Sequence, residues 1–307
     1  MSKKKILVTD SLFIFDEHVK QLNDANIFVE RLDKLRATEQ ELISALKGKD
    51  GYILGGDERV SDGVVKSFDN LKVISVAATD WRQFVPGWRE ALSMGIKITN
   101  APHINAKAVA EWLLSTGLAM NRDLFGLGKM GDKTFNTVKE ISELKVGVIG
   151  LGHIGLEAAR LFDAIGANVV YWSKSVKNVK FKKQNLNQLL KTSDIVLFCV
   201  SAAAGEDYVN ADKLKMLKNG AIVTSLNIAV TDEEALLAEL KNGRIRGFLD
   251  WTPKNPEFQK ISFSNFYCSN SSSAFNTHRA NKMTSDIVTR SIIKILNSQD
   301  DEYVVNY

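Results

Sequence analysis

The sequence contains few of the side chains that build disulfide frameworks or metal centres. Its 307 residues include two cysteines, Cys199 and Cys268, and four histidines. Neither cysteine belongs to a CxxC motif and both stand in apolar or strand-like contexts, so we expect buried thiols rather than a disulfide or a metal pair. The histidines show no spacing typical of metal ligands: His18, His103, His153 and His278. The sequence therefore predicts no metal site.

Long apolar runs and a large charge of one sign are absent as well. Lys3, Lys4 and Lys5 lead into an apolar run too short for a signal-peptide core, and no later window approaches the length of a membrane span. Lysine and arginine number 40 against 36 aspartates and glutamates, and this small excess is dispersed, unlike the footprint of a nucleic-acid-binding protein. We therefore expect a cytoplasmic protein with neither a membrane nor a nucleic-acid partner.

Apolar runs of strand length alternate with segments of helical periodicity along most of the chain. The chain is long enough for two domains, and 45% of its residues are hydrophobic. Strand-like runs lie at residues 6–8, 27–29, 52–54, 73–76 and 96–98, and again at 146–149, 169–171, 195–198, 221–223 and 247–249. Such alternation is typical of parallel sheets with helices on both faces. The sequence thus predicts an α/β fold with two doubly wound parallel-sheet domains.

The chain is expected to cross between the two domains twice. Residues 99–102 interrupt the alternation, and a long apolar-rich helix is expected from about residue 106 to residue 121. From about residue 276 a second long helix follows, and residues 303–305 are extended enough to rejoin the first sheet. One domain therefore combines residues 1–100 with 277–307, and the other comprises residues 101–276.

Residues 145–174 contain a complete strand, turn, helix and second strand. The motif Gly150-x-Gly152-x-x-Gly155 directly follows the first strand and opens an amphipathic helix. Gly150 permits the tight turn, Gly152 lets the backbone approach a pyrophosphate, and Gly155 lets the helix lie close to the strand. A glycine-rich turn without a ligand is the alternative, but the complete strand–turn–helix–strand context favours dinucleotide binding.

The residues around this turn indicate which dinucleotide is bound. The helix N-terminus at His153 and Ile154 is expected to meet the pyrophosphate. The acidic residue that would accept the ribose hydroxyls at the end of the second strand is replaced by Ser173, and Lys174 follows. A hydroxyl and a cation suit a 2′-phosphate, so we expect NADP to be preferred over NAD. The alternative is that Lys174 only begins an exposed, lysine-rich loop.

Five tracts together resemble the D-isomer-specific 2-hydroxyacid dehydrogenase family over nearly the whole chain. They are residues 71–79, residues 95–96 with 99–102, residues 108–111, the glycine turn, and residues 232–250. The resemblance implies a flavodoxin-like substrate domain (residues 1–100 and 277–307) and a Rossmann dinucleotide-binding domain (residues 101–276). It also implies a cleft between them and, usually, a homodimer built on the dinucleotide-binding domains.

The resemblance also shows where this sequence departs from the family. Its chemistry requires an arginine for the substrate carboxylate, a histidine for proton transfer and a glutamate that keeps the histidine basic. These fall on Asn227, Ser271 and Asn255 respectively. The alternative, that His103 or His278 replaces the histidine, stays open, although a solvated or hinge-packing role suits both better.

A fourth departure lies in the expected substrate cleft. The family has a glycine-bearing turn after the fourth strand, whose amides receive the substrate carboxylate, and that glycine position is Asp80. A substrate carboxylate would therefore meet a carboxylate. Residues expected beside it in the cleft are Ala78, Thr79, His103 and Lys107. Ordinary turnover of 2-hydroxy acids is not expected.

Two functions remain after these departures. The first is an NAD(P)-dependent oxidoreductase with an altered substrate that is not a simple 2-oxo acid, with hydride transfer lacking the usual arginine, glutamate and histidine. The second is a catalytically silent nucleotide-binding protein that acts as a redox sensor or partner surface. An enzyme must enclose a shaped pocket beside the nicotinamide, whereas a sensor needs the nucleotide site and the hinge but tolerates any cleft.

Overall fold

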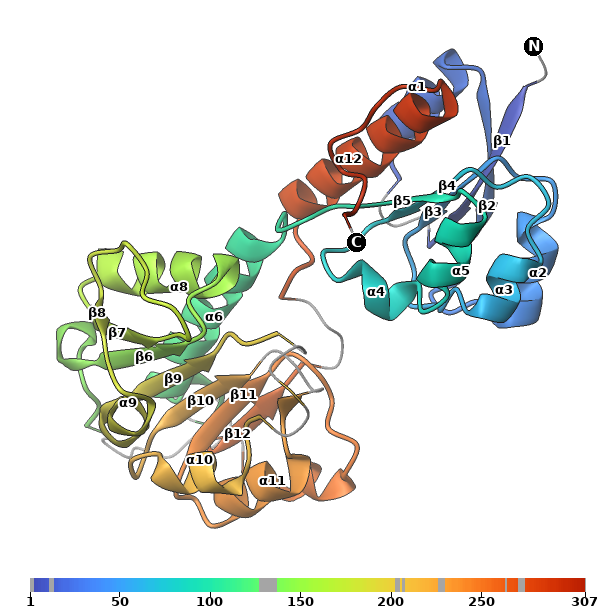
Figure 1. Cartoon of the computed structure of the whole chain (residues 1–307). Helices are drawn as coiled ribbons and strands as arrows, with labels where there is room; N and C mark the ends of the chain where they lie inside the picture. Colours follow the sequence, from blue (N-terminus) through green and yellow to red (C-terminus); the bar gives the residue numbers. More distant parts are fainter. Residues whose placement is uncertain are drawn as a thin grey trace. The chain divides into compact units, whose positions relative to one another are not determined.

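The computed structural model describes residues 3–10, 14–126, 137–201, 205, 208–225, 230–262, 264–269 and 274–306. The chain folds as two compact units (Figure 1). Unit 1 is Met1–Ile104 with Thr277–Tyr307, and unit 2 is Asn105–Asn276. Each unit is built around its own parallel sheet.

Unit 1 contains a five-stranded parallel sheet in the order β2-β1-β3-β4-β5. Its strands are β1 (Lys4–Thr9), β2 (Ile27–Leu32), β3 (Gly51–Leu54), β4 (Val73–Val76) and β5 (Lys97–Asn100). Its helices are α1 (Asp16–Asp24), α2 (Glu39–Leu46), α3 (Asp62–Lys66), α4 (Trp81–Phe84), α5 (Trp88–Ser93) and α12 (His278–Leu296). The strand order reverses direction between β1 and β3, which is the flavodoxin-like arrangement.

Helices cover both faces of the unit 1 sheet. On one face α2, α3 and α5 bury Leu42, Val64 and Ala91 against the strands. On the other face α1 and α12 bury Leu22 and Ile292. Strands β3 and β4 are consequently buried along their whole length, as a parallel sheet covered on both sides requires.

The C-terminal tail completes unit 1. Val304 forms an antiparallel bridge with Thr99 of β5, and the Val305 N–H donates to the Ile98 carbonyl at 3.0 Å. Val305 is buried with the core residues on the α2 side of the sheet. The prediction that residues 303–305 rejoin the first sheet is therefore confirmed.

Unit 2 contains a seven-stranded parallel sheet in the order β12-β11-β10-β9-β6-β7-β8. Its strands are β6 (Lys145–Ile149), β7 (Asn168–Trp172), β8 (Lys182–Lys183), β9 (Ile195–Phe198), β10 (Ile222–Ser225), β11 (Arg246–Leu249) and β12 (Phe266–Cys268). Its helices are α6 (Ala106–Asn121), α8 (His153–Ala164), α9 (Leu186–Thr192), α10 (Ala211–Met216) and α11 (Glu233–Lys241), with 3₁₀ turns η2 (Ile141–Glu143) and η5 (Pro256–Lys260). Counted from β6, this is the Rossmann strand order with one added edge strand.

The helices of unit 2 also lie on both faces of its sheet. Helices α6 and α8 pack on one face, where Leu113 and Phe162 are fully buried. Helices α9, α10 and α11 pack on the other, where Leu189, Leu214 and Leu240 are fully buried. The predicted fold, two doubly wound parallel-sheet α/β domains, is confirmed.

The two cysteines were expected to be buried thiols rather than a disulfide, and neither forms a disulfide. Cys199 and Cys268 are free, and each is partly exposed. Burial of the thiol raises the pKa of Cys199 to about 12 and also raises the pKa of Cys268, so both are protonated and poorly nucleophilic at neutral pH.

Among the residues that the structure describes, no three acidic, histidine or cysteine side chains are grouped so that they could hold a metal ion. No helix in the described ranges is long and apolar enough to cross a membrane.

Candidate functional site

The glycine turn lies at the carboxyl edge of the unit 2 sheet, where the strand order reverses between β6 and β9. The Gly150 N–H donates to the Trp172 carbonyl at the end of β7, at 2.9 Å. The Cys199 N–H, just past β9, donates to the Ile149 carbonyl at 2.8 Å. The turn is therefore held between the strands on either side of β6, which is where open α/β sheets bind ligands.

Each of the three glycines meets a different steric requirement. Gly150 has a φ of +93°, and a Cβ on it would lie 2.6 Å from the Cys199 carbonyl oxygen. A Cβ on Gly155 would lie 2.1 Å from the Gly150 carbonyl oxygen, so only glycine lets α8 start this close to the strand. A Cβ on Gly152 would meet nothing within 4 Å. Gly152 thus faces open space, as a residue approached by a ligand does.

The first turn of α8 follows Gly152 directly. Gly152 occupies the N-cap position and has no side chain to satisfy the first N–H groups. His153 is exposed, and Ile154 packs against the core on the α6 side of the sheet. The backbone N–H groups and the positive end of the helix dipole make this turn suitable for a pyrophosphate. These residues fit a dinucleotide.

The loop after β7 carries the residues expected to choose between NAD and NADP. Ser173 is buried, and its hydroxyl donates to the Ser175 carbonyl at 2.5 Å. The Lys177 N–H donates to the Tyr171 hydroxyl at 3.2 Å, which ties the loop back to its strand. Lys174 is exposed and has no ion-pair partner in the described part of the chain. Ser173 thus shapes the turn, and the charge of Lys174 is available to a ligand.

The position expected for the family's glutamate has a structural role. The Asn255 side chain accepts a hydrogen bond from the Glu257 N–H at 2.9 Å and so caps η5. Its amide donates to Glu234 Oε1 of α11, also at 2.9 Å. Both ends of the Asn255 side chain are therefore engaged in local structure.

The other two positions expected for catalysis, Asn227 and Ser271, lie outside the described residues. The segments before them are defined, because β10 ends at Ser225 and β12 ends at Cys268, at the same edge of the sheet as the glycine turn. Asp250 follows β11 at this edge, and its buried carboxylate accepts the Ala274 N–H at 3.0 Å.

The predicted cleft residues of unit 1 form a compact turn after β4. The Thr79 hydroxyl accepts the His103 N–H at 2.9 Å, and the Thr79 carbonyl accepts the Asn100 amide at 2.9 Å. The Ala101 N–H donates to the Ala78 carbonyl at 3.2 Å. His103 is exposed and has a φ of +63°, a left-handed conformation fixed by its bond to Thr79.

Asp80 and Lys107 are both exposed but belong to different units. Asp80 precedes α4 in unit 1, where its side chain makes no capping bond. Lys107 lies in the first turn of α6 in unit 2. The structure thus brings Ala78, Thr79, Asp80 and His103 together within unit 1, and Lys107 is not part of that unit.

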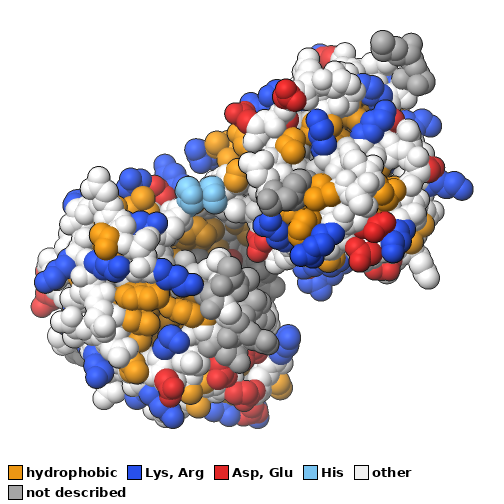
Figure 2. Space-filling model, in the orientation of Figure 1, with side chains coloured by type: hydrophobic (Ala, Val, Ile, Leu, Met, Phe, Trp, Pro, Cys, Tyr) orange, Lys and Arg blue, Asp and Glu red, His pale blue; other side chains and the backbone are white. Residues whose placement is uncertain are grey.

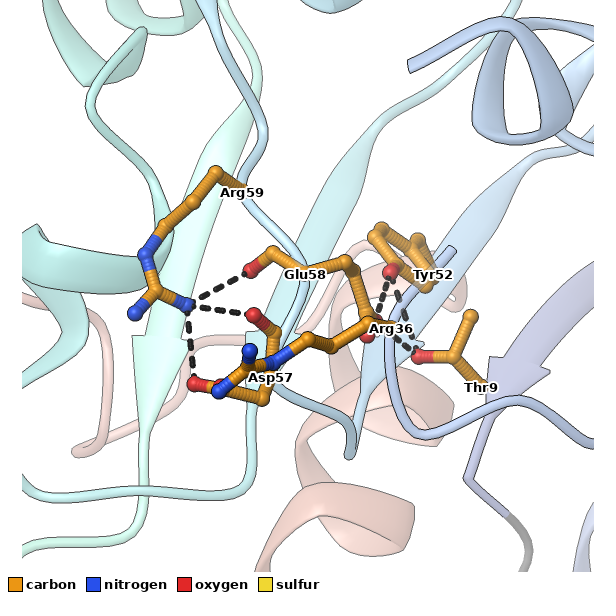
Figure 3. Close-up of polar contacts among 6 residues, drawn as sticks. All are labelled: Thr9, Arg36, Tyr52, Asp57, Glu58 and Arg59. Atoms are coloured by element: carbon orange, nitrogen blue, oxygen red, sulfur yellow. Dashed lines mark hydrogen bonds and ion pairs between the residues drawn. The ribbon is translucent and has the colours of Figure 1, made fainter. Parts of the chain in front are cut away.

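Sequence reasoning missed a buried polar cluster at the carboxyl edge of the unit 1 sheet (Figure 3). The Tyr52 hydroxyl donates to Glu58 Oε1 at 2.6 Å, and the Thr9 hydroxyl donates to the same oxygen. Burial, followed by the nearby Glu58 carboxylate, raises the pKa of Tyr52 well above its ordinary value, so Tyr52 stays a donor. A Cβ on Gly56 would lie 2.1 Å from Glu58 Oε2. The adjacent Gly55 and Gly56 after β3 were therefore the feature of the sequence that could have indicated this cluster.

Comparison with known proteins agrees with this geometry. The model of the D-isomer specific 2-hydroxyacid dehydrogenase, NAD binding domain, matches residues 117–269. A glyoxylate reductase from Thermofilum pendens is 26% identical over 294 residues, covering 88% of this chain and 85% of that protein. A D-lactate dehydrogenase from Treponema pallidum is 29% identical over 233 residues, covering 70% of this chain and 67% of that protein.

Solved structures share the fold over almost the whole chain. The TT0316 protein from Thermus thermophilus has a TM-score of 0.88 at 22% identity, covering 98% of this chain and 100% of that one. An acyclic imino acid reductase (Bsp5), solved with NADPH and D-Arg, has a TM-score of 0.85 at 22% identity with the same coverage. The match to the family's NAD binding domain and to its curated relatives, with the two sheet orders and the intact glycine turn, shows that the chain belongs to the D-isomer-specific 2-hydroxyacid dehydrogenase family.

Proposed function

We propose that this protein is an NADP-preferring oxidoreductase whose substrate is not a simple 2-oxo acid. The observation that carries this proposal is the contrast between the two halves of the site. The glycine turn has every feature that a dinucleotide requires, while the positions of the family's arginine, glutamate and histidine are Asn227, Asn255 and Ser271. Bound nicotinamide would supply the hydride chemistry, and the residues of this chain would bind and orient it.

A solved structure with the same fold contains a compound that is not a 2-hydroxy acid. The acyclic imino acid reductase was solved with NADPH and with D-Arg, which carries nitrogen where a hydroxy acid carries oxygen. At 22% identity this likeness concerns the fold alone. The exposed carboxylate of Asp80 in unit 1 is compatible with a substrate that carries a cationic group, because it would attract that cation.

Engagement of Asn255 in local structure favours a second candidate. A position that caps η5 and bonds to Glu234 is not free to orient a proton donor. A catalytically silent nucleotide-binding protein, acting as a redox sensor or partner surface, needs only the glycine turn. Oxidation of NADPH in the presence of a panel of imino acids, followed by the absorbance of the reduced nicotinamide, separates the two candidates, because only an enzyme consumes the nucleotide.

NADPH is expected to stabilise the protein more strongly than NADH. Lys174 supplies one exposed cation to a 2′-phosphate, worth about 1–2 kcal/mol, or roughly a tenfold preference that falls with added salt. At about a hundred times its Kd a ligand stabilises the fold by about 2.7 kcal/mol, which thermal unfolding resolves. We expect Lys174→Ala to remove the preference and to leave NADH binding unchanged.

Lys180→Ala is the matched control for this measurement. Lys180 lies on the same loop but already pairs with Asp163, so its loss removes the same charge without removing a free cation. If NADH stabilises the wild type as well as NADPH does, and Lys174→Ala changes nothing, the preference for NADP is wrong. If neither nucleotide shifts the unfolding midpoint, nucleotide binding itself is wrong.

We further propose a cytoplasmic homodimer that is joined through unit 2. Helix α6 supports this, because Trp112 and Leu114 on it are only partly covered by the core of unit 2. Light scattering at micromolar concentration should give twice the chain mass of 34.1 kDa. A monomeric mass would refute the homodimer.

A further inference from the structure

Two arginines and two tryptophans form a connected surface on α4 and α5 of unit 1. The Trp81 and Trp88 rings meet edge to face, with centroids 6.0 Å apart. The Arg82 guanidinium lies 4.4 Å from the Trp81 ring centre and 5.6 Å from that of Trp88. The Arg89 guanidinium lies 4.3 Å from the Trp88 ring centre. Both cations are therefore held against one indole, and we call these four residues the arginine–tryptophan surface.

In the described part of the chain the arginines of this surface have no ion-pair partner, unlike Arg36, Arg59 and Arg290 of the same unit. Arg36 and Arg59 both bind Asp57 (Figure 3), and Arg290 lies 3.5 Å from Glu302. Arg82 and Arg89 are exposed and, among the residues that the structure describes, neither forms an ion pair. Two positive charges therefore lie against the same indole, and in the described ranges neither is paired with a carboxylate.

The scaffold beneath the surface is fixed by backbone contacts. The Val60 N–H donates to the Phe84 carbonyl at 2.9 Å, and the Gly87 N–H donates to the Val60 carbonyl at 2.9 Å. A Cβ on Gly87 would lie 2.7 Å from the Ser61 carbonyl carbon, so the turn between α4 and α5 is pressed onto this loop. Glu58 lies in the same loop, and the hydrogen bond that its carboxylate accepts from the Tyr52 hydroxyl holds the loop against β3. The two arginines thus project from a rigid base.

The surface lies where parallel α/β sheets bind ligands. Helix α4 begins at Trp81, shortly after β4 ends at Val76, so it stands at the carboxyl edge of the unit 1 sheet. In Figure 2 basic side chains gather over the part of unit 1 where α4 lies. The nucleotide turn belongs to the other unit.

A guanidinium stacked on an indole keeps its N–H edges free and in a fixed plane. This is the arrangement that recognises a carboxylate or a phosphate with paired hydrogen bonds, and less side-chain entropy is lost on binding because stacking has already restrained the arginine. We propose that the arginine–tryptophan surface binds an oxyanion group of a small molecule, with Arg82 and Arg89 as donors and Trp88 as the platform that positions them.

Calorimetric titration of the full-length protein tests this site. Sodium phosphate and sodium malonate are titrated separately, at a constant ionic strength set by chloride. We expect saturable binding of at least one anion, and the anion that binds identifies the group as phosphate or carboxylate. Arg82→Gln and Arg89→Gln should each weaken binding roughly fivefold to tenfold, as expected for loss of a charge-assisted pair at an exposed site.

Two further variants distinguish a built site from general attraction. Arg82→Lys keeps the charge but loses the planar fork, so it should weaken binding nearly as much as Arg82→Gln. Arg122→Gln removes an exposed arginine of unit 2 and should leave the titration unchanged. Thermal unfolding without anion confirms that each variant is folded.

The double variant Arg82→Gln/Arg89→Gln decides between this surface and other anion sites. Any heat that it retains belongs to sites elsewhere, such as the glycine turn, and is subtracted from the wild-type titration. The proposal is overturned if the double variant binds phosphate and malonate as the wild type does, if neither anion saturates the wild type, or if Arg122→Gln weakens binding as much as Arg82→Gln.

Discussion

Replacing Gly152 with alanine is expected to abolish stabilisation by nucleotide while leaving the unliganded fold almost unchanged. A Cβ at this position meets no atom within 4 Å, and the backbone (φ −83°, ψ −161°) suits any residue. Alanine is a poorer N-cap than glycine but restricts the unfolded chain more, so the free energy of unfolding should change by less than about 1 kcal/mol. The methyl group would instead occupy the path by which a pyrophosphate approaches the α8 amides.

Gly155→Ala, unlike Gly152→Ala, is expected to lower the stability of the unliganded protein. Its Cβ would lie 2.1 Å from the Gly150 carbonyl oxygen, so α8 would have to move away from the turn. We expect a loss of about 1–3 kcal/mol in the unliganded protein, as for other overpacked sites. Thermal unfolding of both variants, with and without NADPH, measures these effects. Equal stabilisation of Gly152→Ala and wild type by NADPH would show that the nucleotide does not approach the turn at Gly152.

Turnover of ordinary family substrates is expected to be very slow. Lactate, glycerate, glyoxylate, hydroxypyruvate and phosphoglycerate, each tested with both nucleotides, should react at least about 100-fold below the usual range of roughly 1–10³ per second. The reason is that the positions at which the sequence analysis expects the family's arginine and histidine carry Asn227 and Ser271.

The hydrogen bonds of Asn255 indicate that restoring a glutamate at this position would not by itself restore turnover. Glutamate at position 255 would face Glu234, which now accepts the Asn255 amide at 2.9 Å, and two carboxylates would then oppose each other. Steady-state assays of the wild type decide the prediction, and a nucleotide-induced thermal shift in the same sample confirms that the site is competent to bind. A turnover within the usual range for any substrate of the panel would contradict it.

The glycine turn could be read from the sequence because its requirements are local. Gly150 and Gly155 are constrained by the adjacent strand and by the turn itself, so the spacing of the glycines within a strand–turn–helix–strand unit was enough to predict their roles. The parallel arrangement of both sheets followed from the alternation of apolar runs and the right-handed crossover rule. Short edge strands escaped this reasoning, because β8 has two residues and β12 has three, too few to show a period.

Features that depend on distant contacts could not be read in the same way. Glu58 looks like an ordinary surface acid, and only the fold brings it against Thr9 and Tyr52 from two different strands. Arg82 and Arg89 belong to helices of four and six residues, too short to show a hydrophobic face, so their stacking on tryptophan was not foreseen. The role of Asn255 was also hidden, because its partner Glu234 lies on a different helix.

The return of the chain end to unit 1 sets the order in which the protein can mature on the ribosome. Unit 2 is continuous in the chain, whereas the core of unit 1 needs Ile292 of α12 and Val305 of the tail. The strands of unit 1 are therefore synthesised before the residues that complete their core. The sheet face that α12 covers stays exposed until α12 has emerged. During this interval the nascent protein presents Ile6, Ile53 and Val73 to the surroundings, which is the type of surface that holding chaperones bind.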